Sequence, residues 1–355
     1  METTTAEFRK RIIQASAAKA PLRIRGGGSK DWYGQDLQGE VLDTGGYRGI
    51  VSYEPTELVI TARCGTPLAD VEASLARHNQ MLAFEPPYFG TGATIGGMVA
   101  SGLSGPRRQH VGAVRDFMLG AVLMDGKGEV LHFGGQVMKN VAGYDVSRLL
   151  AGSLGTLGLL LEVSLKVLPR PVSETTLRFG LGMAEAIRRL NEWGGQPLPI
   201  SASAWHNGVL IARLSGAEAA VGMAKRRIGG EEVEADSIWA GLREQTSDFF
   251  SLKDAGSLWR LSVPSHVPPL DLPGEQLIEW GGAQRWLKPE GDIEAASIRS
   301  AAEQAGGHAT LFKGGDKRAG VFHPLAAAVE KIHRNLKHAF DPSGIFNRGR
   351  MYHDF

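Results

Sequence analysis

The sequence predicts an α+β fold in which a ligand-binding domain of two subdomains is followed by a smaller cap domain. Short apolar strands and a few helices alternate in the first half of the chain, with three glycine-rich loops among them. The second half carries the order βαββαβ between residues 174 and 235, which is typical of a split ferredoxin-like unit. A chain of 355 residues is long enough for two or three lobes with hydrophobic cores.

The domain boundaries follow from a change in pattern. Pro169-Arg170-Pro171 ends the first set of strands, and the segments beyond it have a different character. We therefore expect the ligand-binding domain at 1–170 and the cap domain at 171–315. A C-terminal helix and tail at 316–355 are expected to return to the ligand-binding domain.

The elements of the first domain follow from hydrophobic periodicity and turn signals. Phe8, Ile12 and Ala15 repeat at helical spacing, with Ile13 beside them, and predict a helix over 5–18. The other expected helices are 67–78, capped by Thr66, 95–101 and 145–150, and the expected strands are 22–24, 40–44, 49–53, 58–62, 117–124, 129–133 and 159–167.

The elements of the cap domain follow from the same signals. His206-Asn207-Gly208 is a tight hairpin turn between two expected strands. The expected strands are 174–179, 200–205, 209–214, 232–235, 258–263, 276–280, 284–287 and 308–312, and the expected helical stretches are 183–193, 217–228, 237–250 and 293–305. A last helix is predicted over 323–340.

Charge and cysteine content exclude several classes of protein. The formal net charge is +1 and no long basic run occurs, so nothing indicates a nucleic-acid partner. Cys64 is the single cysteine, so the chain can form no internal disulfide and cannot supply the four thiolates that usually hold an iron–sulfur cluster. We expect Cys64 to be a buried apolar residue.

No targeting or membrane segment is expected. The N-terminus lacks the basic, apolar and cleavage regions of a signal peptide. The longest uncharged run, 86–106, is too rich in glycine and proline to form a membrane helix. We therefore expect a cytoplasmic protein without a transmembrane segment, and we assign no metal ligand.

The stretch 90–108 is the most informative part of the sequence. It has six glycines and no charge before Arg107. Because glycine has no Cβ, the backbone N–H groups of such a loop can approach a ligand closely and bind phosphate oxygens. A helix beginning near residue 95 would add its positive end. The stretch predicts a phosphate cradle, although a flexible glycine loop without a ligand has the same composition.

Two further loops favour a ligand. Arg25-Gly26-Gly27-Gly28-Ser29 follows one short strand, and the glycine-rich segment 152–158 precedes another. Three such loops in one half of a chain predict a single large ligand with a diphosphate. The commoner phosphate motifs do not fit, because Ile95 stands where the dinucleotide fingerprint has its third glycine and no Gly-Lys-Ser or Gly-Lys-Thr occurs.

These loops resemble the FAD-binding domain of the vanillyl-alcohol oxidase and D-lactate dehydrogenase superfamily. The resemblance rests on 25–29, on Gly-Ala-Thr-Ile-Gly-Gly at 92–97 and on Gly-Ser-x-Gly-Thr-Leu-Gly at 152–158. Lys-Asn-Val-Ala-Gly-Tyr-Asp at 139–145 and Phe-Asp-Pro-Ser-Gly-Ile-Phe-Asn at 340–347 extend it to the end of the chain. Within the superfamily the chain resembles the small FAD-binding subunits of bacterial glycolate oxidases.

The resemblance implies that FAD is bound without a covalent link. Some relatives attach FAD through a histidine directly after the third glycine of the first loop, and this chain has Ser29 there. The diphosphate is assigned to 25–29 and 92–97, and the adenosine or ribityl side to 101–105 and 152–158. The expected FAD-binding residues are Arg25, Gly26, Gly27, Gly28, Ser29, Gly92, Ala93, Thr94, Ile95, Gly96, Gly97, Ser101, Gly102, Gly105, Gly152, Ser153, Gly155, Thr156 and Gly158.

The resemblance also implies oxidation of a 2-hydroxy acid, which needs a cation for the carboxylate and a base for the hydroxyl proton. Catalytic relatives carry a His-x-Gly-Asp-Gly-Asn-x-His segment in the cap, of which this chain keeps only His308. His308 is the candidate base, although a structural histidine fits as well. The candidate cations are Lys313, Arg107, Arg108 and Arg348, and Arg348 stands where the tail motif usually has proline.

A subunit of this kind implies partners. The resemblance predicts a larger FAD-linked glycolate oxidase subunit and an iron–sulfur subunit that receives the electrons, and these partners could hold the chain at the inner membrane. Two other functions stay open on the sequence. One is a self-sufficient FAD-dependent dehydrogenase of an alcohol or 2-hydroxy acid, and the other is a non-catalytic assembly subunit that retains the flavin fold.

Overall fold

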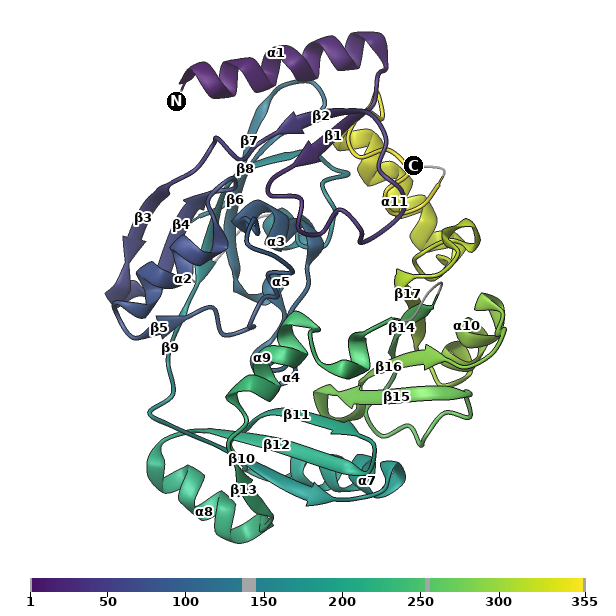
Figure 1. Ribbon diagram of the computed structural model, residues 1–355. Coiled ribbons are helices and arrows are strands. Elements are labelled where there is room, and N and C mark those ends of the chain that lie inside the picture. The colour runs from purple at the N-terminus through teal and green to yellow at the C-terminus, as the bar shows by residue number, and fades with distance from the viewer. Residues whose placement is uncertain (1, 136–144, 253–255, 354–355) are drawn as a thin grey trace. The chain divides into compact units, whose positions relative to one another are not determined.

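The structure is a computed structural model that describes residues 2–135, 145–252 and 256–353 (Figure 1). The chain divides into two compact units. The first unit comprises Met1–Leu103, Ala113–Pro169 and Pro324–Phe355, and the second comprises Ser104–Gly112 and Arg170–His323. The units differ from the expected domain ranges chiefly at 104–112, because this segment of the predicted cradle belongs to the second unit.

The first unit is built on a five-stranded antiparallel sheet in the order β3-β4-β8-β6-β7. Its strands are β3 (Ile50–Glu54), β4 (Val59–Arg63), β6 (Met118–Met124), β7 (Val130–Gly134) and β8 (Leu159–Lys166). Two strand pairs stand apart from it, parallel β1 (Leu22–Arg25) with β2 (Glu40–Asp43) and antiparallel β5 (Gln80–Met81) with β9 (Leu168–Pro169). Every strand predicted for this unit is found, whereas β5 and β9 are too short to produce a period in the sequence.

The helices of the first unit are short except for those at the two ends of the chain. They are α1 (Glu2–Ala18), α2 (Leu68–Ala76), α3 (Ile95–Ser101), α5 (Val114–Phe117), α6 (Val146–Leu149) and α11 (Ala327–Phe340). Phe8, Ile12 and Ala15 of α1 are buried in a cluster with side chains of β1, β2, β6, β8 and the tail. Ile13 points outward and is 49% exposed, so the apolar stripe of α1 is confirmed without it.

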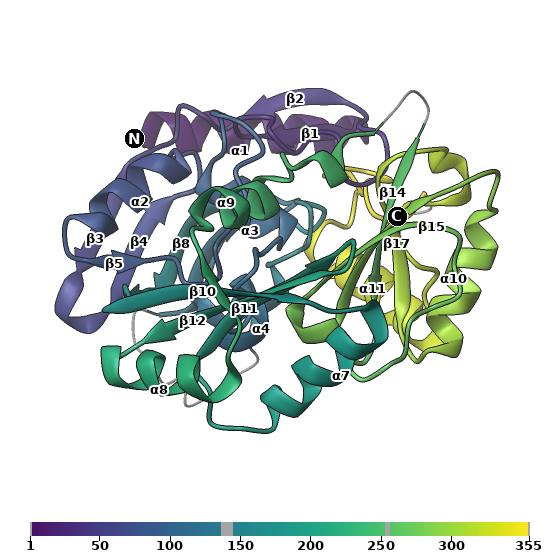
Figure 2. The same ribbon diagram turned by 60° about the horizontal axis from the view of Figure 1, so that its bottom comes forward.

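The second unit has one sheet of eight strands in the order β13-β10-β12-β11-β15-β16-β14-β17. The predicted βαββαβ order is confirmed by β10 (Ser173–Gly180), α7 (Met183–Gly194), β11 (Ile200–His206), β12 (Val209–Gly216), α8 (Glu218–Ile228) and β13 (Glu231–Val233). Residues of α7 and α8 share one core with β10, β11 and β12, so both helices cover the same face of these strands (Figure 2). The turn between β11 and β12 has positive φ at Asn207 and Gly208, as a two-residue hairpin requires.

The other half of this sheet is formed by β14 (Ser257–Ser262), β15 (Gly274–Glu279), β16 (Gln284–Pro289) and β17 (His308–Gly314). Helix α10 (Ala295–Gln304) packs on β14, β16 and β17. Two helices that the sequence placed poorly or not at all also belong to this unit, α4 (Arg108–Val111) and α9 (Asp236–Glu244).

Three helix predictions were wrong at their ends. The stretch 237–250 is not one helix, because α9 ends at Glu244, Gln245 takes φ +54° and a separate 3-10 turn follows. The last helix begins at Ala327 rather than at 323, since proline at 324 disfavours helical backbone at the residue before it. Thr66 does not cap α2, and its hydroxyl instead accepts the N–H of Gly49 at 2.9 Å.

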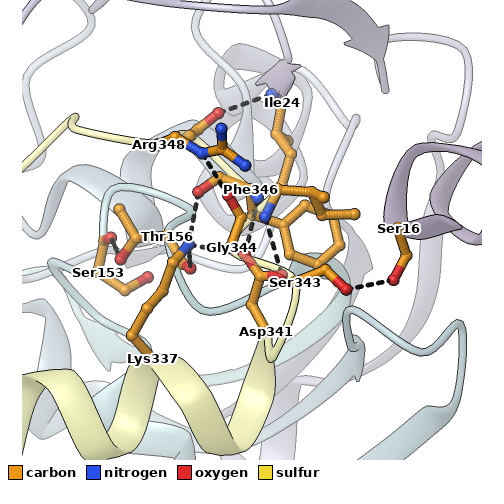
Figure 3. Close-up of polar contacts among 12 residues, drawn as sticks. Ser16, Ile24, Ser153, Thr156, Lys337, Asp341, Ser343, Gly344, Phe346 and Arg348 are labelled. Atoms are coloured by element: carbon orange, nitrogen blue, oxygen red, sulfur yellow. Dashed lines mark hydrogen bonds and ion pairs between the residues drawn. The ribbon is translucent and has the colours of Figure 1, made fainter. Parts of the chain in front are cut away.

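A buried ion pair fixes the C-terminal tail to the first unit (Figure 3). The Lys337 ammonium donates to Asp341 Oδ2 at 2.7 Å and to the carbonyls of Thr156 and Phe346 at 2.8 Å each. The Asp341 carboxylate also accepts the N–H groups of Ile345 at 3.0 Å and Phe346 at 2.8 Å. All three ammonium protons are used, so the charged pair is fully hydrogen-bonded in the interior.

Lys337→Met is expected to destabilise the protein by about 3–5 kcal/mol, because Asp341 would remain buried without its cation. Urea denaturation followed by circular dichroism measures the loss. Lys331→Met, at an exposed position of the same helix, is the matched control and should change stability by less than about 0.5 kcal/mol. Equal midpoints for the two variants would show that the buried pair does not hold the tail.

Candidate functional site

A cleft in the first unit brings parts of the three glycine-rich loops together. It encloses about 780 Å³ of empty space, part of which is open to solvent. The predicted residues that line it are Arg25, Gly26, Gly27, Gly28, Ser29, Thr94, Gly96, Gly97, Ser101, Gly155 and Gly158. One ligand in this cleft would therefore meet all three loops.

The first loop offers backbone donors to the cleft. In the described ranges no protein group accepts from the N–H groups of Gly26, Gly27, Gly28 or Ser29. Gly28 has φ +73°, and a Cβ there would lie 2.4 Å from the guanidinium of Arg25. Adjacent backbone N–H groups without partners form a concave anion site, which suits a phosphate group.

Two arginines at the start of this loop, Arg23 and Arg25, both contact the carboxylate of Asp31. Asp31 Oδ2 accepts from Arg23 Nη2 at 2.8 Å and lies 3.0 Å from Arg25 Nε. One negative charge against two positive charges leaves an excess of positive charge beside the free N–H groups. The local electrostatics therefore favour an anionic ligand.

The second loop packs directly on the first, and this contact requires glycine. A Cβ at Gly27 would lie 1.4 Å from the carbonyl oxygen of Gly92, and one at Gly26 would lie 2.4 Å from Thr94 Oγ1. Thr94 also caps α3 by accepting the N–H of Gly97 at 3.2 Å. Gly26 and Gly27 therefore allow the backbones of the first and second loops to pack closely, and they also leave room for a ligand.

Glycine is required at position 96 because this residue packs closely against Cys64. A Cβ at Gly96 would lie 2.7 Å from Cys64 Cβ and 2.9 Å from the Cys64 carbonyl oxygen. The Cys64 thiol is buried, as expected, and burial raises its pKa, so it remains a protonated, unreactive group. Glycine at 96 is thus needed for packing against Cys64.

The third loop is held against α3 and faces two cavities. The N–H of Gly152 donates to the Val99 carbonyl at 3.0 Å, and the N–H of Leu154 donates to the Ala100 carbonyl at 2.8 Å. Residues of this loop that line the cleft are Leu154, Gly155 and Gly158, whereas Gly152, Ser153, Thr156 and Leu157 line a second pocket of the first unit. The predicted residues of this loop therefore do not all face one ligand.

Eight predicted residues lie outside the lining of the cleft. Gly152, Ser153 and Thr156 line the second pocket, and the other five line neither cavity, namely Gly92, Ala93, Ile95, Gly102 and Gly105. Gly102 ends α3 with φ +64°, where a Cβ would lie 2.8 Å from Gly152 Cα. Gly105 belongs to the second unit. The motif segment 139–144 lies outside the described residues.

Two residues of the tail line the cleft although they were not among the predicted site residues. Asn347 Oδ1 accepts the N–H of Ile24 at 2.8 Å, and Asn347 Nδ2 donates to the Leu154 carbonyl at 2.6 Å. Arg350 donates to the carbonyls of Gln35 at 3.1 Å and Lys30 at 3.0 Å. The tail motif signalled a return to the first domain, but not that these side chains would form part of the cleft.

Arg350 brings a buried positive charge to the cleft. Its residue is 5% exposed, and burial lowers the pKa of the guanidinium to about 10. The group still carries its proton at neutral pH, since that pKa lies well above 7. The sequence had pointed to Arg348 as the cation of the tail, two residues earlier.

Two of the candidate cations have structural partners instead. Arg348 donates to the carbonyl of Gly344 at 2.8 Å, which closes the turn of the tail (Figure 3). It also donates to the carbonyl of Lys19 at 3.1 Å. Arg107 is buried in the second unit, where its Nη2 donates to Glu174 Oε2 at 2.7 Å. Neither side chain lines the cleft.

His308 and Lys313 both lie on β17 of the second unit. Five residue-to-residue steps of extended chain separate them by roughly 16 Å, so one two-carbon acid does not contact both. Desolvation of the His308 ring, together with the charges of Arg260 and His323, lowers its pKa. The imidazole is therefore neutral at neutral pH and able to accept a proton.

The cleft fits the diphosphate part of a dinucleotide cofactor. The free N–H groups of 26–29 supply donors without side chains, and Arg25, Lys30 and Arg350 supply positive charge. The loop contacts at Gly26 and Gly27 fix the spacing of these donors. In the part of the chain that the structure describes, no cluster of three or more His, Cys, Asp or Glu residues is placed to hold a metal ion.

Comparisons with known proteins agree with this cofactor. Residues 2–134 match the family model described as FAD binding domain. The chain is 52% identical to "Glycolate oxidase subunit GlcE" of Escherichia coli (strain K12), over 97% of this chain and 96% of that protein. It is 39% identical to "Glycolate oxidase subunit GlcD" of Bacillus subtilis (strain 168), over 24% of this chain and 18% of that protein.

A solved structure shows the same fold. An alkyldihydroxyacetonephosphate synthase superimposes with a TM-score of 0.67 over 96% of this chain and 73% of that chain, at 14% sequence identity. Together with the FAD-binding family match, this confirms the predicted fold, and FAD is the cofactor of this chain. Among the helices described here, none has the length and apolar character to cross a bilayer.

Gly27→Ala is expected to lower flavin content strongly, because the new methyl group would force the first loop away from the Gly92 carbonyl. The flavin-to-protein absorbance ratio after reconstitution with FAD measures the effect. Gly46→Ala is the matched control, since a Cβ at Gly46 meets no heavy atom within 4 Å. Full flavin content in a folded Gly27→Ala protein would show that the spacing of these loops does not govern binding.

Proposed function

The chain belongs to the family of the glycolate oxidase subunit GlcE, and from this we propose that it is the FAD-binding subunit of a complex that oxidises glycolate to glyoxylate. It is an FAD-dependent oxidoreductase that acts on CH–OH donors. The observation that carries the proposal is the cleft of the first unit, where backbone donors without a protein partner and the charged side chain of Arg350 line the same space. The substrate, the partners and the roles of individual residues are parts of the proposal.

FAD is held in the cleft without a covalent bond. Ser29 occupies the position at which some relatives carry the linking histidine, and no histidine lines the cleft among the described residues. The N–H groups of 26–29 would hold the diphosphate oxygens, with the positive charge of Arg350 close by. Backbone groups supply most of these contacts, so few side-chain substitutions remove binding altogether.

When bound, FAD supplies the acceptor for a hydride from the carbon that bears the hydroxyl group. The chain's own residues orient the cofactor. Asn347 fixes β1 to the third loop, so two walls of the cleft keep their spacing. His308, which is neutral at neutral pH, is the residue of the second unit proposed to accept the hydroxyl proton.

The electrons pass to partners. A larger FAD-linked subunit and an iron–sulfur subunit complete the proposed complex, and they would hold this chain peripherally at the inner membrane. The support within this chain is chemical, because its one cysteine is buried and protonated and cannot help to hold a cluster. The word subunit in the names of both glycolate oxidase relatives supports an assembly.

One alternative has a specific observation in its favour. His308 and Lys313 are too far apart along β17 to serve one small substrate, and Arg107 and Arg348 have structural partners. This distribution favours a subunit whose flavin is not itself reduced by substrate. A self-sufficient dehydrogenase is the other alternative, and turnover by the isolated chain separates the two.

The purified chain is expected to be yellow and to release free FAD on acid treatment, since no covalent link is available at Ser29. Removal of FAD should lower stability by roughly 3–4 kcal/mol when the cofactor was present at about 100 to 1,000 times its dissociation constant. Absorbance of the acid supernatant and urea denaturation of holo and apo protein measure the two effects. Flavin that stays with the precipitated chain would contradict the non-covalent site.

The isolated chain is expected to show little or no dye reduction with glycolate, and activity should appear when it is combined with the larger flavin subunit and the iron–sulfur subunit. The reason is that Lys313 lies too far along β17 from His308 to bind the same substrate, and Arg107 and Arg348 have structural partners. Steady-state dye assays on each subunit and on the reconstituted set measure this, with D-lactate as a second substrate. Full turnover by the isolated chain would support the self-sufficient dehydrogenase instead.

A further inference from the structure

The second pocket of the first unit has a basic lining. It encloses about 900 Å³ of empty space, part of which is open to solvent. Its polar side chains are Arg115, Arg148, Ser153, Thr156, His333 and Lys337, and no carboxylate lines it among the residues that the structure describes. Lys337 is paired with Asp341 and Arg148 with Asp145, so the uncompensated positive charge of the lining comes from Arg115. The positive electrostatic potential of this lining favours binding of an anion and disfavours binding of a metal ion.

The two arginines come from neighbouring short helices. Arg115 lies on α5, is exposed and forms no ion pair within the described ranges. Arg148 lies on α6, and its Nε is 2.7 Å from Asp145 Oδ2, which engages one edge of the guanidinium only. A planar guanidinium binds a carboxylate through two parallel hydrogen bonds.

Ser153 gives a second and independent sign of a ligand. The residue is 8% exposed, yet its hydroxyl has no hydrogen-bond partner in the described part of the chain and is not closed off from open space. Its backbone carbonyl accepts the Thr156 hydroxyl at 2.7 Å, which holds the side chain at the pocket wall (Figure 3). The hydroxyl is therefore available to hydrogen-bond a ligand in the pocket in place of water.

The other walls of the pocket are apolar and consist of Leu149, Leu157, Leu336 and Met351. A strongly hydrated inorganic anion gains nothing from such walls, whereas an organic anion buries its carbon atoms against them. We propose that this pocket binds a small organic carboxylate, with the carboxylate on Arg115 and Arg148 and a further oxygen on Ser153. The choice of 2-hydroxy or 2-oxo acids within that class rests on the proposed function.

The third glycine loop links this pocket to the flavin cleft. Leu154, Gly155 and Gly158 line the cleft, while Ser153 and Thr156 of the same loop line the pocket. A carboxylate in the pocket therefore contacts a loop that also bounds the cofactor site. The flavin spectrum should report its binding without any turnover.

The test uses the full chain loaded with FAD and measures binding by isothermal titration and by flavin difference spectra. The probes are glycolate, oxalate, which cannot be oxidised by loss of a hydride, and inorganic phosphate. We expect both carboxylates to bind more tightly than phosphate and to perturb the flavin spectrum. Arg115→Gln should weaken carboxylate binding about tenfold or more, because a charged hydrogen bond is lost.

Ser153→Ala should weaken glycolate binding several-fold, which gives a second variant outside the arginines. Lys331→Gln is the matched control, because it removes an exposed charge of α11 that does not line the pocket. Unchanged denaturation midpoints show that the variants are folded.

Four outcomes would overturn the proposal: no binding of either carboxylate, equal affinity of Arg115→Gln and the unaltered chain, preference for phosphate, or binding confined to chain without FAD. The last would assign the pocket to the cofactor. A protein that takes up no flavin would contradict the proposed function, while titration of oxalate into that same protein would still decide the pocket.

Discussion

The buried carboxylate of Asp341 is the constraint on which the first unit depends. A charge in the interior must be paired and hydrogen-bonded, and Asp341 meets this requirement only if Lys337 and two backbone N–H groups surround it. Those N–H groups belong to Ile345 and Phe346, so the chain must turn back directly after α11. The turn then brings the carbonyl of Ile345 to the N–H of Leu22 at 2.7 Å and joins the tail to β1.

The same network determines the shape of the two cavities. Lys337 holds the carbonyl of Thr156, and Asn347 holds the carbonyl of Leu154, so the third loop is fixed from the tail at two points. Its other side is tied to α3 through Gly152. A loop restrained in this way presents 154, 155 and 158 to the cleft and 152, 153, 156 and 157 to the second pocket. Little ordering is left for a ligand to impose.

The sequence predicts the strands and the loops well because both depend on local signals. Period-two alternation and turn residues give the strands of both units, and glycine content gives the loops. It does not reveal Arg350, because that residue reaches the cleft only after the tail folds back over more than 300 residues of chain. The end of α9 at Gln245 is missed for a related reason, since a left-handed residue other than glycine carries no signal in composition.

The sequence suggests that glycines in these loops let a ligand approach the backbone. In the structure, close packing between segments of the chain also requires them. At Gly27 the nearest obstacle to a side chain is the Gly92 carbonyl, and at Gly96 it is Cys64, through its Cβ and its carbonyl oxygen. These glycines permit the loops to close on each other, and the closure leaves the N–H groups of 26–29 as donors with no protein partner. The phosphate binding proposed for this cleft would thus result from loop packing, with charge added by Arg25 and Arg350. A side chain changes cofactor affinity most where it disturbs that packing, even where it touches no cofactor atom.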